Sequence, residues 1–166
     1  ITLTEKPKPI SPIYADIDLK LSMGKHGIND GLLYNEELLE KIVKVYQDEI
    51  KKYLEVTDDS IICCVFEKDG LEDKKPHWGN GIHLLFPNII VNSKIRYLIR
   101  NFVICNSKKL GLFTTYDNPV EDIIDISIIE RNNIMLFGSK KPNSKYYYNY
   151  TKCYNSSLEL IENDSI

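Results

Sequence analysis

Apolar and polar residues alternate with clear periods along the chain, and the period of each stretch predicts its structure. Between Ile13 and Leu19 the odd positions are apolar, whereas Asp16 and Asp18 occupy even positions, a strand pattern that places both carboxylates on one face. From Asn35 to Leu54 apolar residues recur at helical spacing against a charged face. The first third of the chain therefore predicts a strand followed by an amphipathic helix.

The same reading extends along the rest of the chain. A second helix is expected from Ser93 to Leu110, where Gly111 fits the C-terminal stop. Lys20 to Tyr34 and Lys68 to Pro76 are rich in Gly, Pro and charge, which indicates a loop and a connector. Three further strands are predicted, at Ser60 to Glu67, Gly81 to Phe86 and Ile134 to Phe137, and Val120 to Ile129 is an acidic apolar segment.

This order of strand, helix, strand, strand, helix and strand predicts an α+β fold with helices packed on one face of a sheet. A chain of 166 residues is long enough for one domain with a real core, so we expect residues 1–166 to form a single domain. The sequence leaves two alternatives for residues 143–166, which are rich in Asn and Tyr: an edge strand or a linker.

Composition limits the classes of function. A net charge of −3 argues against a protein that coats nucleic acid nonspecifically, but it leaves room for a nucleic-acid enzyme whose local basic and acidic sites cancel in the total. No apolar run approaches the roughly 18 residues that would cross a bilayer, and the start has no signal-peptide pattern. We therefore expect a soluble, intracellular protein without a membrane partner.

Carboxylates in a mostly buried strand are costly unless a cation neutralises them. Asp16 and Asp18 alone are weak evidence, because acidic residues two apart are common, but their apolar setting favours a divalent metal such as Mg²⁺ or Mn²⁺. A third ligand is expected downstream. Asp125 lies between apolar residues and is the best candidate, whereas Asp122 lies nearer a polar link and remains the alternative.

Two further segments carry candidate chemistry. His83 follows the small-residue run Gly79-Asn80-Gly81, where a backbone can approach a phosphate or sugar closely, although a satisfied core histidine is the ordinary alternative. Lys140 and Lys141 follow a Gly-Ser turn and are suited to a triphosphate, although paired lysines in a turn are usually just solvated. The turn lacks the upstream glycine of a P-loop.

In this order, the segments YADIDLKL, GIHLLFPNIIV, IIDISII and NIMLFGSKKP resemble the archaeo-eukaryotic primase (AEP) superfamily. They look most like the primase domain of the poxvirus-type primase-helicases of nucleo-cytoplasmic large DNA viruses. The resemblance runs from about Ile13 to Pro142. The three family motifs are an Asp-x-Asp strand, a small-x-His strand start and a lone Asp on a hydrophobic strand. Each motif is short, so the specificity lies in their order and spacing.

The resemblance implies an AEP primase fold, with an RRM-like catalytic sheet and an N-terminal α/β unit. It implies synthesis of short primers from nucleoside triphosphates on single-stranded DNA with Mg²⁺ or Mn²⁺. It also implies a superfamily 3 helicase in the same full-length chain or complex, and a place in the host cytoplasm or nucleus if the protein is viral. By position, the implied catalytic and metal-binding residues are Asp16, Asp18 and Asp125, and the implied nucleotide-binding residues are Gly81, His83, Ser139, Lys140 and Lys141.

The sequence departs from the family pattern in two places. Gly81 stands where relatives often have Ser, and Lys74 and Lys75 lie further upstream than the basic residues of relatives, which leaves their phosphate role open. Met135 stands where relatives often have Arg, so the triphosphate depends on Lys140, Lys141 and Arg131.

Other classes of protein fit parts of the pattern. A catalytically inactive RRM-like nucleic-acid-binding module is expected to lack the carboxylates, all three of which are present. A rolling-circle replication nuclease holds its metal by paired histidines, whereas His83 stands alone. A glycosyltransferase with Asp-x-Asp normally needs a larger nucleotide-binding sheet. The sequence does not distinguish ribonucleotide from deoxyribonucleotide use, or replication from repair.

Overall fold

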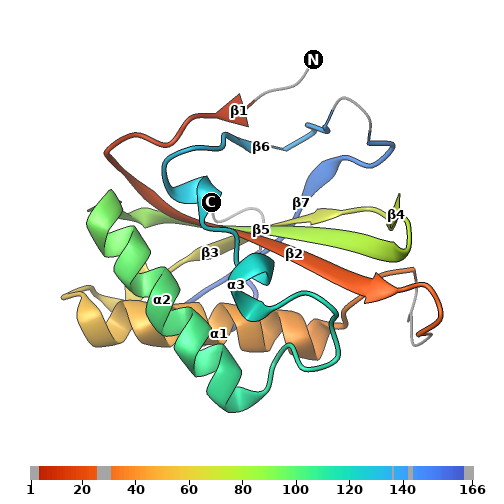
Figure 1. Ribbon diagram of the computed structural model, residues 1–166. Coiled ribbons are helices and arrows are strands. Elements are labelled where there is room, and N and C mark those ends of the chain that lie inside the picture. Colours follow the sequence, from red (N-terminus) through yellow and green to blue (C-terminus); the bar gives the residue numbers. More distant parts are fainter. Residues whose placement is uncertain (1–3, 26–30, 136, 142–143, 163–166) are drawn as a thin grey trace.

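The protein is described by a computed structural model over residues 4–25, 31–135, 137–141 and 144–162. Within these residues a five-stranded sheet has its helices on one face and a small two-stranded sheet on the other (Figure 1). The layered α+β architecture expected from the sequence is therefore confirmed. The strands are β1 (Thr4–Glu5), β2 (Ile10–Ser22), β3 (Cys63–Lys68), β4 (Glu72–Lys74), β5 (His77–Asn92), β6 (Ile134–Met135) and β7 (Tyr148–Tyr154).

The larger sheet is antiparallel in every pairing and has the order β2-β5-β3-β7, with β4 paired to β5. β1 and β6 pair with each other in the two-stranded sheet. Of the two alternatives for the tail, residues 148–154 form a strand at the edge of the larger sheet. The tail therefore contributes side chains to the same sheet as the acidic strand β2.

Two long helices, α1 (Glu36–Tyr53) and α2 (Ser93–Leu110), lie where the periodicity predicts them. The side chain of Asn35 accepts a hydrogen bond from the backbone of Leu38 and caps α1, and Asn92 caps α2 in the same way. Gly111 ends α2 in the left-handed conformation, φ 65°. Both helices cover the sheet face opposite to β1 and β6 (Figure 1).

The core lies between these helices and the sheet. The odd-numbered residues of β2 point into it, so that Ile17 and Leu19 are almost completely buried, as are Leu84 of β5 and Leu39 of α1. Because side chains alternate across a strand, the even-numbered residues of β2 must project from the other face of the sheet. The fold therefore presents the acidic positions on the face that carries no helices.

Several boundaries differ from the sequence prediction. The connector after β3 contains the strand β4, and β2 continues to Ser22 into the expected loop, of which residues 26–30 lie outside the described residues. The expected strand at 134–137 spans only Ile134–Met135, and residue 136 also lies outside the described residues. Pairing with β5 extended β2 and formed β4 beyond what local pattern indicates.

The segment around Asp125, which the family pattern describes as a strand, is mostly helical. It consists of the short helix α3 (Val120–Ile123) and a 3₁₀ turn (Ser127–Ile129), and a single β-bridge joins Ile124 to Ile17. The strand assignment was wrong because one bridge is too short to make a strand. Among the described residues no helix is long and apolar enough to cross a membrane.

Candidate active site

Asp16 and Asp18 lie on β2, opposite the predicted motif on β5. The register pairs Asp16 with His83 and Asp18 with Gly81. Directly opposed residues of an antiparallel pair point to the same face of the sheet. The structure therefore brings these four predicted residues together on the face that the helices leave free.

The Asp16 carboxylate is partly buried and incompletely satisfied. Its Oδ1 lies 3.4 Å from His83 Nε2, and the side chain is 14% exposed. Among the described residues this oxygen has no hydrogen-bond donor. Burial acts to raise the pKa of Asp16, but the charges of His83, Lys141 and Lys68 outweigh it and hold the pKa below its ordinary value.

Asp18 behaves in the opposite way. Burial, and then the negative charge of Asp16 beside it, raise the pKa of Asp18 above its ordinary value. Lys74, Lys141 and Lys68 act against this rise without overcoming it. Two neighbouring carboxylates, one of them destabilised in its ionised form by the other, are a site that gains from a bound cation.

His83 is held on three sides. Its side chain is 3% exposed, and Nδ1 lies 3.3 Å from the carbonyl oxygen of Met135. Because a carbonyl oxygen only accepts, Nδ1 carries the proton of this contact and Nε2 faces Asp16. The ring also stacks on Tyr148, with 3.7 Å between ring centroids. His83 is therefore fixed beside the carboxylates, with Nε2 toward them.

Tyr148 is a site residue that sequence reasoning missed. It lies on β7, two strands away from β5, and reaches His83 across Gly81. A Cβ atom built on Gly81 would lie 2.5 Å from the Tyr148 hydroxyl and 3.6 Å from Asp18 Oδ1. Glycine is therefore needed at 81 because the tyrosine occupies the space of a side chain.

The Tyr148 hydroxyl is fully buried, and among the described residues it has no hydrogen-bond partner. Burial raises the pKa of Tyr148 well above its ordinary value, so the hydroxyl keeps its proton. The ammonium of Lys68 lies 5.0 Å from the ring centroid. The tyrosine-rich run was visible in the sequence, but its register against β3 could not be deduced from local pattern.

The predicted nucleotide-binding residues after β6 have different neighbours. Ser139 forms a β-bridge with Tyr148 and is 1% exposed, and Lys141 exerts its charge on both Asp16 and Asp18. Lys140 lies over the ring of Tyr147, 4.8 Å from its centroid. The structure therefore places Ser139 beside Tyr148, Lys141 near the carboxylates, and Lys140 against the ring of Tyr147.

Lys74, whose role the sequence left open, lies near the site because β4 pairs with β5. Its Cδ lies 2.8 Å from the position of a Cβ on Gly79, so its stem covers that glycine. Its ammonium lies 3.4 Å from Glu72 Oε2, and its charge acts on Asp18. Lys75 is 79% exposed. The β4–β5 hairpin therefore places Lys74 near Asp18 and Lys75 in solvent. This pairing could not be predicted from the sequence.

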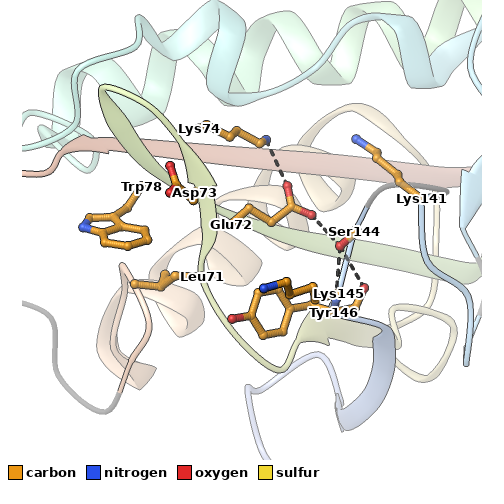
Figure 2. A pocket seen from close by; sticks show the side chains of 9 residues that line it. All are labelled: Leu71, Glu72, Asp73, Lys74, Trp78, Lys141, Ser144, Lys145 and Tyr146. Atoms are coloured by element: carbon orange, nitrogen blue, oxygen red, sulfur yellow. Dashed lines mark hydrogen bonds and ion pairs between the residues drawn. The ribbon is translucent and has the colours of Figure 1, made fainter.

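A cavity of about 440 Å³ opens beside these lysines, between β4 on one side and Lys141 and residues 144–146 on the other (Figure 2). Glu72 lies in its wall, paired with the buried ammonium of Lys68 at 2.8 Å. Burial acts to raise the pKa of Glu72, but the hydrogen bonds from Lys68 and Ser144 lower it to about 2. The lining residues are Leu71, Glu72, Asp73, Lys74, Trp78, Lys141, Ser144, Lys145 and Tyr146.

Asp125 lies against the free edge of β2. Its backbone N–H donates to the carbonyl of Asp16 at 2.9 Å, next to the bridge between Ile17 and Ile124. The Asp125 carboxylate accepts hydrogen bonds from the backbone and hydroxyl of Ser127. Asp122 is exposed on α3. Of the two alternatives for a third carboxylate, Asp125 is the one next to the acidic pair.

Arg100 of α2 fixes this segment from below. Its Nε and Nη2 donate to the carbonyl of Ile124, and Nη2 also donates to the carbonyl of Glu121 at 2.6 Å. Arg100 is only 8% exposed. Its hydrogen bonds therefore hold α3 and the Asp125 segment in place against β2. Sequence reasoning missed this residue, because an arginine on a helix is usually solvated.

The donor set fits a divalent cation in part. Among the described residues, no three His, Cys, Asp or Glu side chains already surround a common point. The unpartnered Oδ1 of Asp16, the raised pKa of Asp18 and the oxygen-only character of both groups nevertheless suit Mg²⁺ or Mn²⁺. Asp125 would have to turn from Ser127 to complete a set of three.

Comparison with known proteins identifies the family of the chain. Residues 1–154 match the family described as "C962R protein N-terminal AEP domain". The chain is 29% identical over 154 residues to the "Putative helicase L207/L206" of Acanthamoeba polyphaga mimivirus. It is 30% identical over 181 aligned positions to the "Putative helicase 121R" of Invertebrate iridescent virus 3.

These matches cover 92% and 98% of the chain but only 16% and 18% of the two viral proteins. The chain thus spans less than a fifth of the length of these curated relatives. The match to the domain family covers almost the whole chain and includes the acidic strand, the His83 strand and the Asp125 segment. The chain therefore belongs to the AEP domain family of large DNA viruses, within the archaeo-eukaryotic primase superfamily.

Proposed function

We propose that this domain is the catalytic part of a DNA primase, which synthesises short primers from nucleoside triphosphates on single-stranded DNA. One observation carries the proposal: Asp16 and Asp18 share a face of the sheet with His83, and one buried carboxylate oxygen has no donor among the described residues. In a domain of this family, such a carboxylate pair is suited to hold the cation of nucleotidyl transfer.

The residues divide into two roles. Asp16 and Asp18, with Asp125 as third ligand, would hold Mg²⁺ or Mn²⁺. A cation held there would supply a lowered pKa to the attacking 3′-hydroxyl and neutralise charge on the triphosphate. Lys141 and Lys74 supply positive charge on the same side of the sheet, where both act on Asp18.

His83 and Gly81 border the same site. The imidazole is held by Met135 and Tyr148, so Nε2 keeps a fixed direction toward Asp16 and toward a phosphate bound next to it. Gly81 leaves the backbone open to close approach at that point. Ser139, which is buried beside Tyr148, borders the phosphate side of the site.

The relatives named helicases suggest the wider context. We propose that the domain works with a superfamily 3 helicase in the same full-length chain or complex, during replication of viral DNA in the host cytoplasm or nucleus. The helicase would supply single-stranded template, and the primase would supply the first 3′-hydroxyl on it.

A primer-synthesis assay tests the proposal. The protein is incubated with a single-stranded DNA template, Mg²⁺ or Mn²⁺, and either ribo- or deoxynucleoside triphosphates, and short products are resolved by electrophoresis. We expect products that depend on the metal, that disappear with Asp125→Asn, and that persist with the matched control Asp122→Asn, because Asp122 is exposed on α3. Products unaffected by Asp125→Asn would remove Asp125 from the site.

One observation favours a second function. Ser127 donates two hydrogen bonds to the Asp125 carboxylate, and a domain in which Asp125 stays engaged in this way would be a noncatalytic RRM-like module that binds nucleic acid. Such a module would bind template in the absence of metal and would yield no product with either class of nucleotide. Any metal-dependent product excludes it.

A further inference from the structure

Two of the four cysteines of the chain lie against each other across neighbouring strands. Cys64 of β3 is directly opposite Cys153 of β7, and their sulfur atoms are 3.5 Å apart, at hydrogen-bond distance. The two residues are 89 positions apart in the sequence. The pairing of β7 with β3 therefore brings together two thiols that no sequence motif connects.

This thiol pair lies on the sheet face that carries the candidate active site. Cys63 and Val65, the neighbours of Cys64 on β3, are completely buried in the core between the sheet and the helices. Because side chains alternate across a strand, Cys64 points to the opposite face. Phe66 lies two residues further along β3 on that face, directly opposite His83. The pair is therefore about 7 Å along the strand from the level of His83.

A β-bulge keeps Cys153 and the tyrosines of β7 on this same face. Cys64 is opposite Cys153 and Phe66 is opposite Tyr150, so β3 advances by two residues where β7 advances by three. Tyr148, two residues before Tyr150, stacks on the active-site imidazole. A covalent bond at Cys153 would therefore act on the strand that positions Tyr148.

The backbone geometry of the pair suits a disulfide bond. Directly opposed residues of antiparallel strands have Cα atoms about 4.5–5.5 Å apart, and disulfides span Cα distances of about 4.4–6.8 Å. The sulfurs would have to approach from 3.5 Å to about 2.0 Å, a shift that side-chain rotation can supply. Cys63 points into the core and Cys105 is exposed on α2, so neither is placed to form this bond.

The two thiols differ in access to solvent and in proton affinity. Cys64 is partly exposed, whereas Cys153 is 1% exposed. The hydrogen bond with Cys153 lowers the pKa of Cys64, although burial acts to raise it. The same hydrogen bond, with burial, raises the pKa of Cys153 well above its ordinary value. The more accessible sulfur is therefore also the one more readily present as a thiolate, which is the form that attacks a disulfide.

We propose that Cys64 and Cys153 are a reversible redox site, which a low-molecular-weight disulfide such as oxidised glutathione converts to an intramolecular disulfide between β3 and β7. The bond fixes β7, and with it Tyr148, to the sheet. Where glutathione keeps thiols reduced, a protein disulfide is usually transient and senses the redox state. The site is separate from the carboxylates and does not depend on the primase proposal.

Two exchange steps balance the reaction. The Cys64 thiolate attacks one sulfur of oxidised glutathione, which forms a mixed disulfide and releases one glutathione thiolate. Cys153 then loses its proton, attacks the Cys64 sulfur and expels the second glutathione thiolate. In the mixed disulfide Cys64 is no longer a thiolate that accepts from Cys153, so one cause of the raised pKa of Cys153 is removed. Overall two protein thiols are oxidised, and one glutathione disulfide takes up their protons and electrons to give two glutathione thiols.

Thiol alkylation and peptide mass mapping test the proposal in a Cys105→Ser variant, because the exposed Cys105 would itself react with glutathione. The reduced protein is incubated with excess oxidised glutathione in EDTA and quenched with acid, and the remaining thiols are alkylated. We expect the loss of two hydrogen atoms and a cross-linked peptide pair that joins Cys64 to Cys153. Excess dithiothreitol should return both thiols.

Two matched variants of this protein identify the sulfurs. With Cys63→Ala added, the disulfide should form as before, since Cys63 faces the core. With Cys153→Ser added, the reaction should stop at the mixed disulfide, with one glutathionyl group on Cys64.

Urea unfolding measures the effect of the bond on β7 and the sheet. The oxidised protein should have an equilibrium constant for unfolding about 30- to 1,000-fold smaller than the reduced protein, the usual effect of a disulfide. The comparison uses one protein in two redox states, so it does not depend on whether a variant folds.

Free thiols after oxidation, or a mixed disulfide that persists in the Cys105→Ser protein, would overturn the proposal. Loss of the cross-link on adding Cys63→Ala would also overturn it, because the bond would then involve the wrong sulfur. Equal resistance of the oxidised and reduced proteins to urea would refute the fixing of β7. All these measurements are made without metal or nucleotide, so their outcome is independent of whether the domain makes primers.

Discussion

Replacing Gly81 by Ala should destabilise the protein through one identifiable clash. The added Cβ would lie 2.5 Å from the Tyr148 hydroxyl but 3.5 Å from the ring carbon that bears it, which is an ordinary contact distance. Tyr148 is fully buried and stacked on His83, so it has little room to withdraw. Overpacking of this kind typically costs about 1–3 kcal/mol.

Tyr148→Phe should remove the clash together with the hydroxyl. Because that hydroxyl has no partner among the described residues, its loss alone should cost almost nothing, or stabilise the protein by up to about 1 kcal/mol. Gly81→Ala should then be harmless in the Tyr148→Phe background. The two substitutions should therefore show a coupling free energy of about 1–3 kcal/mol.

Urea unfolding of the wild type, the two single variants and the double variant measures this coupling from midpoints at constant slope. Additive effects would refute the reasoning, because they would mean that the hydroxyl does not occupy the space beside Gly81. A Tyr148→Phe variant destabilised by more than about 1 kcal/mol would also contradict it, since that is the cost of losing a satisfied hydrogen bond.

Two further predictions concern groups that support the site. Arg100→Leu should lower primer synthesis and reduce the free energy of unfolding by about 1.5–3 kcal/mol. The reason is that it removes the charged donor that holds Ile124 and Asp125 against β2. Normal activity in a correctly folded variant would disprove this role. Burial acts to raise the pKa of Glu72, but the hydrogen bonds from Lys68 and Ser144 lower it from 4.5 to about 2. The contribution of Glu72 to the free energy of unfolding is therefore complete above about pH 4.5 and is lost as the pH falls toward 2. Acid titration of unfolding should therefore be flatter in Glu72→Gln, and an unchanged profile would show that the pair contributes nothing.

Local pattern predicted the elements that have a strong period. The alternation around Asp16 located β2 and the face of both carboxylates, and the helical spacing located α1 and α2, with Gly111 at the end of α2. These succeeded because burial on one face dictates the residue type at each position. The grouping of Asp16 and Asp18 with His83 followed from the ordered motifs and is what the strand register shows.

The parts that depend on long-range pairing could not be predicted. Tyr148 reaches the site because β7 pairs with β3, and Lys74 reaches it because β4 folds back on β5. The segment of Asp125 was expected as a strand, but α3 and one bridge position it instead. Likewise, Ser139 lies beside Tyr148 through one long-range bridge.

The central claim is that Asp16 and Asp18 together hold the cation for joining nucleotides. The most direct test is Mn²⁺-dependent dinucleotide formation on a single-stranded template by the wild type, Asp18→Asn and the exposed-carboxylate control Asp59→Asn. The account predicts that wild type and control form dinucleotide at equal rates, and that Asp18→Asn, folded as judged by circular dichroism, forms none. Dinucleotide formation by Asp18→Asn at the wild-type rate would contradict it.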